Sequence, residues 1–176
     1  MYRFEKKYIL PKRLKNDFLN LIRSYPFNTY KLFSPRLVNN IYFDTLLLHN
    51  YYSNISGDCD RRKYRLRWYG DQHNMIENSN FEIKIKKNDI GSKILYPIKI
   101  LDIEDIKTIK EKISNLDLSN QIKHLMKFLK PTLSNQYYRH YFKTYENEIR
   151  ITLDEKITYK SYLNNFEIIF KENNFI

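Results

Sequence analysis

Charged or polar side chains recur at every second position in three segments of the sequence, residues 61–68, 81–86 and 149–154. Side chains two residues apart lie on the same face of a β-strand, so each segment predicts a strand with one charged and one apolar face. The charged positions are Arg61, Lys63, Arg65, Arg67, Glu82, Lys84, Lys86, Arg150 and Asp154. Arginine and lysine neutralise phosphate oxygens, and arginine can do so through two parallel hydrogen bonds. The spacing therefore indicates binding of a phosphate-rich anion.

Carboxylates are interspersed among these cations. Glu82 shares a strand face with Lys84, Glu5 lies two residues before Lys7, and Glu167 alternates with apolar neighbours near the end of the chain. Hard divalent cations take carboxylate oxygens together with the oxygens of a phosphate ligand. Many cations with a few carboxylates therefore suit a polyphosphate that carries a bound divalent metal.

Two arrangements of the strands fit this alternation. In the first, the charged faces form the solvent side of a half-buried antiparallel sheet. In the second, the sheet closes on itself and the charged faces line a polar tunnel, while helices and apolar packing cover the outside. The alternation by itself fits both arrangements.

Composition excludes several other classes of protein. The 176 residues include 31 Lys and Arg against 20 Asp and Glu, and the formal net charge of +11 favours a polyanionic partner. Three glycines exclude a P-loop and a dinucleotide fingerprint. The single Cys59 excludes a disulfide framework, and the four histidines lack metal-ligand spacing.

The chain is expected to form one cytoplasmic domain over residues 1–176. No apolar run is long enough to cross a bilayer, and the charged N-terminus does not resemble a signal peptide. Any association with a membrane would therefore need a second, membrane-associated chain.

Hydrophobic periodicity predicts mainly strands. They are expected near residues 2–10, 36–44, 61–69, 79–87, 92–99, 133–145, 147–154 and 164–171. Helical spacing predicts a helix over 12–24, a short helix or turn over 45–55, and two helical pieces within 102–129. The predicted fold class is α+β with an antiparallel sheet.

Six pieces of the sequence, in their order along the chain, resemble one known family. They are FEKKYIL (4–10), NNIYFDT (39–45), RKYRLRWYG (62–70), FEIKIKK (81–87), YYR (137–139) and IRITLDEKI (149–157). The family is the VTC domain, the catalytic domain of vacuolar transporter chaperone polyphosphate polymerases, which belongs to the triphosphate tunnel metalloenzymes. The resemblance covers about residues 2–170.

The resemblance implies a fold and an activity. The fold would be an antiparallel β-barrel tunnel, the triphosphate tunnel fold, with peripheral helices. The activity would be transfer of the terminal phosphate of ATP to a growing polyphosphate chain. The cofactor would be a divalent metal, manganese in preference to magnesium. The partners would be ATP and inorganic polyphosphate or triphosphate. Nucleic acid is disfavoured because the cations are spread over at least five strands and no RNA-binding motif is present.

By position, the resemblance also implies roles for individual residues. The cations expected to bind phosphate are Lys7, Arg65, Arg67, Lys84, Lys93, Arg139 and Arg150, and all of these except Lys93 are also expected to act in catalysis. The expected metal ligand is Glu167, with Glu5 and Glu82 as further candidates. Lys63, Lys86 and Lys87 are expected to be solvated charges, Asp44 to fix a turn, and Tyr42, Trp68 and Tyr69 to pack.

The C-terminal part departs from the family pattern. The lysine of a late family strand falls on Ile169, while Lys171 lies one layer further along the same face. The chain also stops at Ile176, short of a further helical segment that carries another phosphate contact in the family. Three functions therefore stay open, namely a polyphosphate polymerase, a binding module without catalysis, and a triphosphatase.

Overall fold

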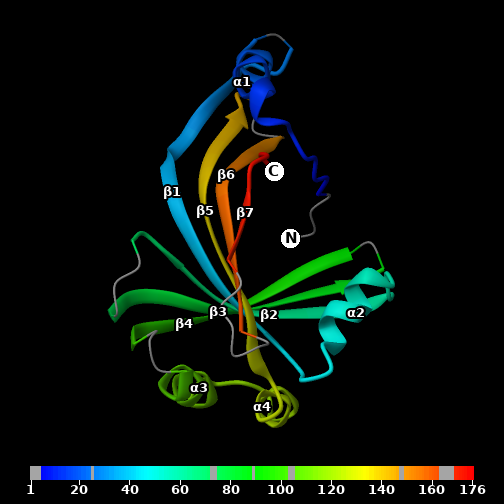
Figure 1. Cartoon of the computed structure of the whole chain (residues 1–176), viewed down its shortest axis with the longest axis vertical. Coiled ribbons are helices and arrows are strands. Elements are labelled where there is room, and N and C mark those ends of the chain that lie inside the picture. The colour runs from blue at the N-terminus through cyan, green and yellow to red at the C-terminus, as the bar shows by residue number, and fades with distance from the viewer. Residues whose placement is uncertain are drawn as a thin grey trace.

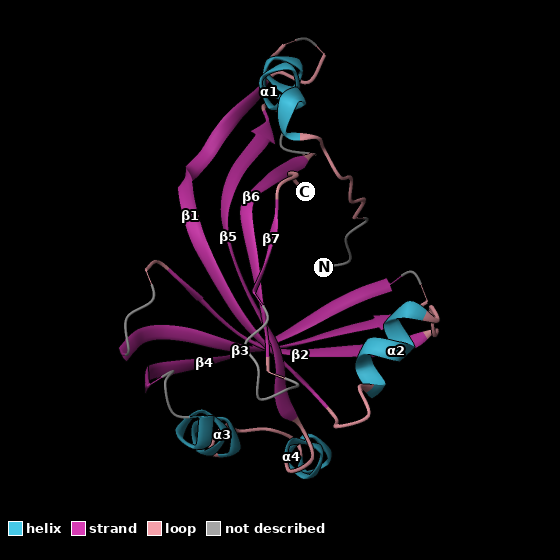
Figure 2. Ribbon diagram, viewed as in Figure 1, coloured by secondary structure: helices cyan, strands magenta, loops and turns pink. Residues whose placement is uncertain are grey.

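The computed structural model describes residues 5–24, 26–71, 75–88, 90–102, 106–146, 149–162 and 169–176 (Figures 1 and 2). Its helices are the 3-10 helix η1 (Lys12–Leu14), α1 (Lys15–Arg23), α2 (His49–Ile55), α3 (Ile106–Ser114) and α4 (Asn120–Met126). Its strands are β1 (Thr29–Asp44), β2 (Asp60–Tyr69), β3 (Met75–Lys87), β4 (Ile90–Asp102), β5 (Lys130–Thr144), β6 (Arg150–Ser161) and β7 (Ile169–Glu172). The predicted α+β class with an antiparallel sheet is confirmed. None of the described helices is long and apolar enough to span a bilayer.

The described strands form one sheet in the order β4-β3-β2-β1-β5-β6-β7. Every neighbouring pair is antiparallel, and the long strand β1 pairs with β2 on one side and with β5 on the other. The strands β4 and β7 lie at the two edges and do not pair with each other, so the described sheet does not close into a barrel. The expected tunnel is therefore not confirmed.

Helices α3 and α4 cover one face of β2, β3 and β4 (Figure 1). The core between them contains Tyr64, Leu66, Trp68, Phe81, Ile83, Ile109 and Ile113, none more than 1% exposed. Burial of a side chain of this size contributes about 1.5–3 kcal/mol to folding. Burying the apolar positions of β2 and β3 leaves their charged positions on the opposite face.

A second apolar cluster joins α1 to β5, β6 and both chain ends. Ile22 of α1 packs with Phe142, Leu153 and Phe175. The backbones of Leu10 and Phe175 exchange hydrogen bonds of 2.8 and 2.9 Å. The N-terminal segment 5–10 is thereby fixed at one end beside β6 and β7, and the rest of it runs toward β2 and β3 (Figure 1).

The structure corrects the strand predicted over residues 2–10. Its described part, residues 5–9, forms no strand, and Leu10 makes a single isolated bridge. Tyr8 and Ile9 are both 70% exposed, so neither side chain belongs to the core. Alternating side chains form a strand only where a sheet edge offers hydrogen bonds, and the described residues 5–9 pair with neither edge strand.

Two strands, β1 and β6, extend furthest beyond their predicted limits. β1 begins at Thr29 rather than at residue 36, and its pairing with β5 shifts register on both sides of Phe33. β6 continues to Ser161 rather than ending at residue 154, and Lys156 within it has a positive φ of 54°. Such irregularities break the two-residue period, so the alternation stops before the strand does.

Candidate functional site

The face of the sheet opposite α3 and α4 carries a group of cations, and we call this side of β1–β5 the basic face. Its central cations are Arg36 on β1, Lys63, Arg65 and Arg67 on β2, Lys84 on β3, Lys93 on β4 and Arg139 on β5. Lys7 and Glu5 of the N-terminal segment also interact with these residues. The structure thus brings together all the sequence-predicted phosphate-binding residues except Arg150.

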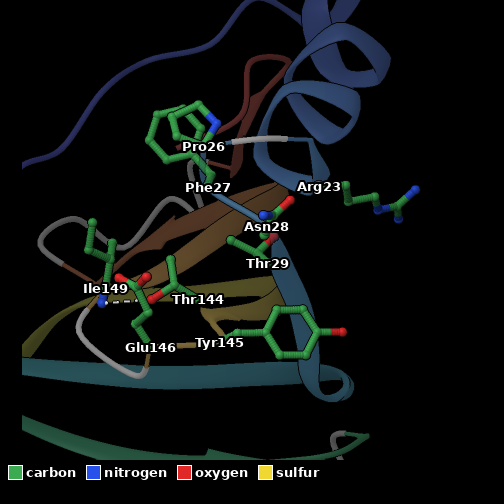
Figure 3. Close-up of a pocket in the computed structure, with 9 residues that line it drawn as sticks. All are labelled: Arg23, Pro26, Phe27, Asn28, Thr29, Thr144, Tyr145, Glu146 and Ile149. Atoms are coloured by element: carbon green, nitrogen blue, oxygen red, sulfur yellow. Dashed lines mark hydrogen bonds between the residues drawn. The ribbon is translucent and has the colours of Figure 1, made fainter.

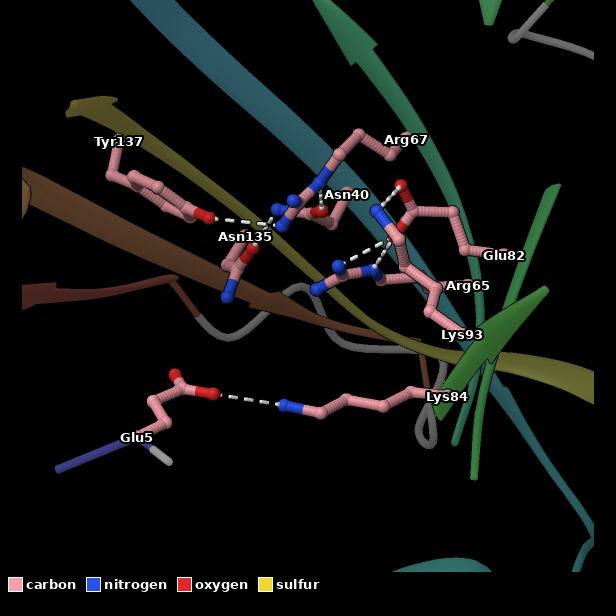
Figure 4. A network of polar contacts seen from close by, with 9 residues as sticks. All are labelled: Glu5, Asn40, Arg65, Arg67, Glu82, Lys84, Lys93, Asn135 and Tyr137. Atoms are coloured by element: carbon pink, nitrogen blue, oxygen red, sulfur yellow. Dashed lines mark hydrogen bonds and ion pairs between the residues drawn. The ribbon is translucent and has the colours of Figure 1, made fainter. Parts of the chain in front are cut away.

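Arg67 lies at the buried centre of the basic face, with 7% of its surface exposed (Figure 4). Its Nε donates to Asn40 Oδ1 at 2.7 Å, and its Nη2 donates to the Tyr137 hydroxyl at 3.0 Å. Asn40 is fixed in turn, because its Nδ2 donates to Asn135 Oδ1 at 2.7 Å. Both partners of Arg67 are neutral, and no carboxylate of the described residues pairs with it.

Arg65 is held by a carboxylate. Its Nε lies 2.6 Å from Glu82 Oε2, and Lys93 Nζ approaches the other Glu82 oxygen at 3.7 Å (Figure 4). Burial disfavours the charged guanidinium, but Tyr42 and Glu82 outweigh that effect and raise the pKa of Arg65. Arg65 is therefore a permanent positive charge with a fixed direction.

Tyr42 belongs to the basic face rather than to the core, which corrects the packing role expected for it. Burial by itself would raise the pKa of Tyr42, but the hydrogen bond and charge of Arg65 and the charges of Arg67 and Lys63 hold it below its ordinary value. A lowered tyrosine pKa is a direct sign of a positive local potential.

Glu5 reaches the basic face from the N-terminal segment. Lys84 Nζ donates to Glu5 Oε2 at 3.2 Å, and Lys7 Nζ lies 3.8 Å from Glu5 Oε1. Burial opposes ionisation of Glu5, but the charges of Lys84 and Lys7 outweigh it and lower its pKa. The side chains of Glu5 and Lys7 are 55% and 71% exposed, so these pairs are accessible to solvent.

Arg139 forms the β5 end of the basic face. Its Nε and Nη2 each donate to one Asp154 oxygen at 2.6 Å, and its guanidinium lies 5.1 Å from the Tyr137 ring centroid. Arg150 lies elsewhere. It is exposed at the start of β6 opposite Lys143, four residues from Asp154 and hence about 13 Å along the strand.

Positive charge exceeds negative charge on the basic face. The described carboxylates at its centre are Glu5, Glu82 and Asp154, against the eight cations Lys7, Arg36, Lys63, Arg65, Arg67, Lys84, Lys93 and Arg139. Part of the charge is fixed by hydrogen bonds to Asn40, Tyr137 and Glu82. A surplus of oriented cations is the arrangement that binds a multiply charged anion.

Comparison with known protein families agrees with this geometry. A family model described as the VTC domain matches residues 2–175. The chain belongs to the VTC domain family. This membership relates it to polyphosphate polymerases. No curated protein matches the chain.

The described residues of this VTC domain do not form a metal site by themselves. Among them, no three His, Cys, Asp or Glu side chains gather into a group that could hold a metal ion. Glu5 and Glu82, two of the predicted ligands, are both paired with cations. The third predicted ligand, Glu167, lies outside the described residues.

A hollow of about 420 Å³ lies far along β5 from Arg67, where β5 ends beside the C-terminal end of α1 (Figure 3). Its lining includes Arg23, Phe27, Thr144, Tyr145 and Glu146. One arginine is balanced there by one glutamate, so this hollow lacks the charge surplus of the basic face.

Sequence reasoning missed the neutral residues that position Arg67 in this VTC domain. Asn40 lies in the NNIYFDT piece, but only the pairing of β1 with both β2 and β5 brings it beside Arg67 and Asn135. Tyr137 is the first residue of the YYR piece, and its hydroxyl gave no signal in the sequence. The turn role expected for Asp44 is confirmed, because its carboxylate accepts from the backbone N–H groups of Thr45, Asn50 and Tyr51.

Proposed function

We propose that this VTC domain binds ATP and the end of a polyphosphate chain on its basic face and transfers the terminal phosphoryl group of ATP to that chain. The observation that carries the proposal is the buried guanidinium of Arg67, which has only neutral hydrogen-bond partners among the described residues. A buried cation without a countercharge is costly unless a ligand supplies the missing negative charge.

The proposed reaction needs no nucleophile from the protein. A terminal oxygen of the polyphosphate chain attacks the γ-phosphorus of ATP and forms a new P–O bond. The bond between the γ-phosphorus and the β–γ bridging oxygen breaks, and ADP leaves with the electron pair. The chain grows by one phosphate, and the number of phosphoanhydride bonds is conserved. Catalysis of such a transfer depends on positioning and on charge stabilisation.

Arg65 and Arg67 would supply that stabilisation. Both guanidiniums are oriented before any ligand arrives, Arg65 by Glu82 and Arg67 by Asn40 and Tyr137. Hydrogen-bond donors that are already oriented do not have to reorganise when negative charge develops on the transferring group. Lys84 and Lys93 would neutralise outer phosphate oxygens from the adjacent strands.

A divalent metal is part of the proposal. When bound, it would supply Lewis-acid stabilisation of the charge on the transferring group. Glu167 is the residue we propose to hold it. Since Glu5 and Glu82 are already ion-paired, we expect the metal to bind with the phosphate ligand rather than before it.

The first test is calorimetric titration of the purified chain with tripolyphosphate, with and without Mn²⁺. We expect saturable binding of about one ligand per chain, strengthened by the metal. Arg65→Ala and Arg67→Ala should each weaken binding strongly. Lys87→Ala is the control, because Lys87 is exposed on the opposite strand face. Equal losses in all three variants would contradict a defined site.

Polymerisation is tested by incubating the chain with ATP and Mn²⁺ and resolving the products by gel electrophoresis. Long phosphate chains together with ADP support the proposal, whereas release of inorganic phosphate alone supports a triphosphatase. The ion pairs of Glu5 and Glu82 favour one further candidate, a module that binds polyphosphate without turnover. Glu167→Ala separates the two, since it should abolish polymerisation but leave metal-free binding intact.

A further inference from the structure

We propose that the basic face continues as a track for the body of a polyphosphate chain, running along β2 and β3 from Arg67 toward Arg61 and Lys86. The inference rests on the proposed function. It adds the direction in which the polyphosphate chain leaves the buried centre. It also assigns a role to Lys63 and Lys86, which were expected to be solvated charges, and to Arg61, for which no individual role was expected.

The strand register defines the track. Arg67, Arg65, Lys63 and Arg61 occupy alternate positions of β2 and so share one face, over about 20 Å of strand. On β3, Lys84 lies opposite Lys63, and Lys86 lies opposite Arg61. Arg67 is buried at 7% exposure, whereas the other cations of the track are partly exposed. The track ends near α2, where β2 begins and β3 ends (Figure 1).

Positive charge along the outer part of the track is uncompensated. No carboxylate of the described residues pairs with Lys63, Arg61 or Lys86, and Arg61 Nη1 donates only to the backbone oxygen of Asp58 at 2.8 Å. Burial and the nearby charges of Lys7 and Lys84 lower the pKa of Lys63. A polyanion that lies between these side chains would relieve their mutual repulsion.

One carboxylate lies on the track. Glu5 pairs with Lys84, but its side chain is 55% exposed and belongs to the N-terminal segment rather than to the sheet. The cost of displacing an exposed ion pair is small. A phosphate group can therefore share Lys84 with Glu5 or replace it there.

The opposite direction along the sheet offers a weaker path. The nearest cations on that side are Arg139, which is bound by both oxygens of Asp154, and Arg36 of β1, which lies opposite Arg139 with its guanidinium against the rings of Phe33, Tyr69 and Tyr141. The next residue of β5 on the same face is Tyr141, which carries no positive charge. A chain that left along β5 and β6 would therefore meet one neutralised arginine and one arginine held against aromatic rings, whereas the path along β2 and β3 offers a continuous row that begins with Lys63 and Lys84.

Two double variants of the full chain test this direction. R61A/K86A removes an arginine and a lysine from the track. R62A/K87A removes the same two residue types one position away, on the opposite face of the same strands. Each protein is titrated at constant ionic strength with tripolyphosphate and with polyphosphate of several tens of phosphates. Thermal melting checks that both variants fold, and R61K/K86R retains the charge with exchanged side chains.

We expect R61A/K86A to bind the long chain about tenfold or more weakly and to bind tripolyphosphate as the unmodified protein does. R62A/K87A and R61K/K86R should stay within about twofold of the unmodified protein for both ligands. Equal loss of long-chain binding in both alanine variants, or no loss in either, would contradict the proposed track. Neither result would contradict a tripolyphosphate site around Arg65 and Arg67. If the unmodified protein binds no tripolyphosphate, the proposed function itself fails, and the track fails with it.

Discussion

At the scale of single residues, Arg67 shows how neutral groups can prepare a cation for an anionic ligand. Asn40 and the Tyr137 hydroxyl accept two of its N–H groups in a fixed direction without cancelling its charge. Arg65 and Arg139 differ, because Glu82 and Asp154 neutralise them in the free protein. Arg67 is therefore the cation that gains most from an incoming phosphate.

This difference makes Arg67→Lys a sharp test. A lysine keeps the charge, but it cannot bind Asn40 and Tyr137 through a rigid fork and also bind a phosphate through two parallel bonds. We expect the dissociation constant for tripolyphosphate to rise at least about tenfold, as measured by calorimetry. Arg62→Lys, at an exposed position on the other face, is the matched control and should change nothing. Unchanged affinity in Arg67→Lys would show that net charge, not oriented hydrogen bonding, determines binding.

Glu5 can be tested as a counter-ion or as a metal ligand. As a counter-ion of Lys84 and Lys7, it competes with phosphate, so Glu5→Gln should raise tripolyphosphate affinity about twofold to fivefold in the presence of a chelator. As a metal ligand it would help binding, so the same change would lower affinity once Mn²⁺ is added. Titrations of both proteins in chelator and in Mn²⁺ measure the two effects separately. Lower affinity in chelator would contradict the counter-ion role.

The residues that the sequence identified and those that it missed differ in one respect. Arg65, Arg67 and Lys84 were predicted on one face because alternation is a local property of a strand with one buried side. Asn40, Asn135 and Tyr137 come from two other strands, and only the register of β1 with β2 and β5 joins them to Arg67. Partners set by long-range pairing leave no periodic signal in the chain.

At the scale of elements, regular strands were predictable and irregular ones were not. The interiors of β2 and β3 fall within their predicted ranges because Tyr64 to Trp68 and Phe81 to Ile85 keep a strict two-residue period. The register shifts of β1 and the positive φ of Lys156 in β6 interrupt that period. Whether the sheet closes depends on its two edge strands, and β7 is only four residues long among the described residues.

Helix α1 is attached to the sheet by an ion-pair network that should respond to pH. Lys15 of α1 and His140 Nε2 of β5 bind the two oxygens of Glu155 in β6, the histidine at 2.8 Å. Burial opposes ionisation of Glu155, but these two partners outweigh it and hold its pKa below the ordinary value of 4.5. Since the folded-state pKa is depressed, the stabilisation is present above pH 4.5 and is lost as pH falls through the folded-state pKa.

Glu155→Gln should therefore lower the free energy of unfolding by about 1–3 kcal/mol at neutral pH. Urea unfolding at a series of pH values measures this difference. It should shrink as the pH falls below 4.5, because the protonated glutamate of the unmodified protein then also lacks its charge. Glu111→Gln, at an exposed position of α3, is the control and should leave stability unchanged at every pH. A difference that stays constant through the acid range would contradict the charge-based attachment.

At the scale of the whole molecule, the N-terminal segment links the C-terminal end of the chain to the basic face. The Leu10–Phe175 bridge holds the N-terminal segment beside β6, and Glu5 carries that segment onto the basic face at β3. The segment thus connects the two halves of the open sheet, through a backbone bridge at Leu10 and a side-chain ion pair at Glu5. Together with a net charge of +11, this arrangement leaves the basic face accessible to a flexible anion.

Salt should therefore act unequally on the two kinds of ligand. Exposed charges are screened over about 10 Å at 0.1 M ionic strength and over about 3 Å at 1 M, whereas buried charges such as Arg67 are screened much less. We expect log K for long-chain polyphosphate to fall more steeply with log salt than log K for tripolyphosphate, because the long chain also contacts partly exposed cations. Titrations of both ligands over this range of NaCl concentration measure the two slopes. In R61A/K86A the long-chain slope should approach that of tripolyphosphate, whereas parallel slopes in the unmodified protein would mean that both ligands contact the same cations.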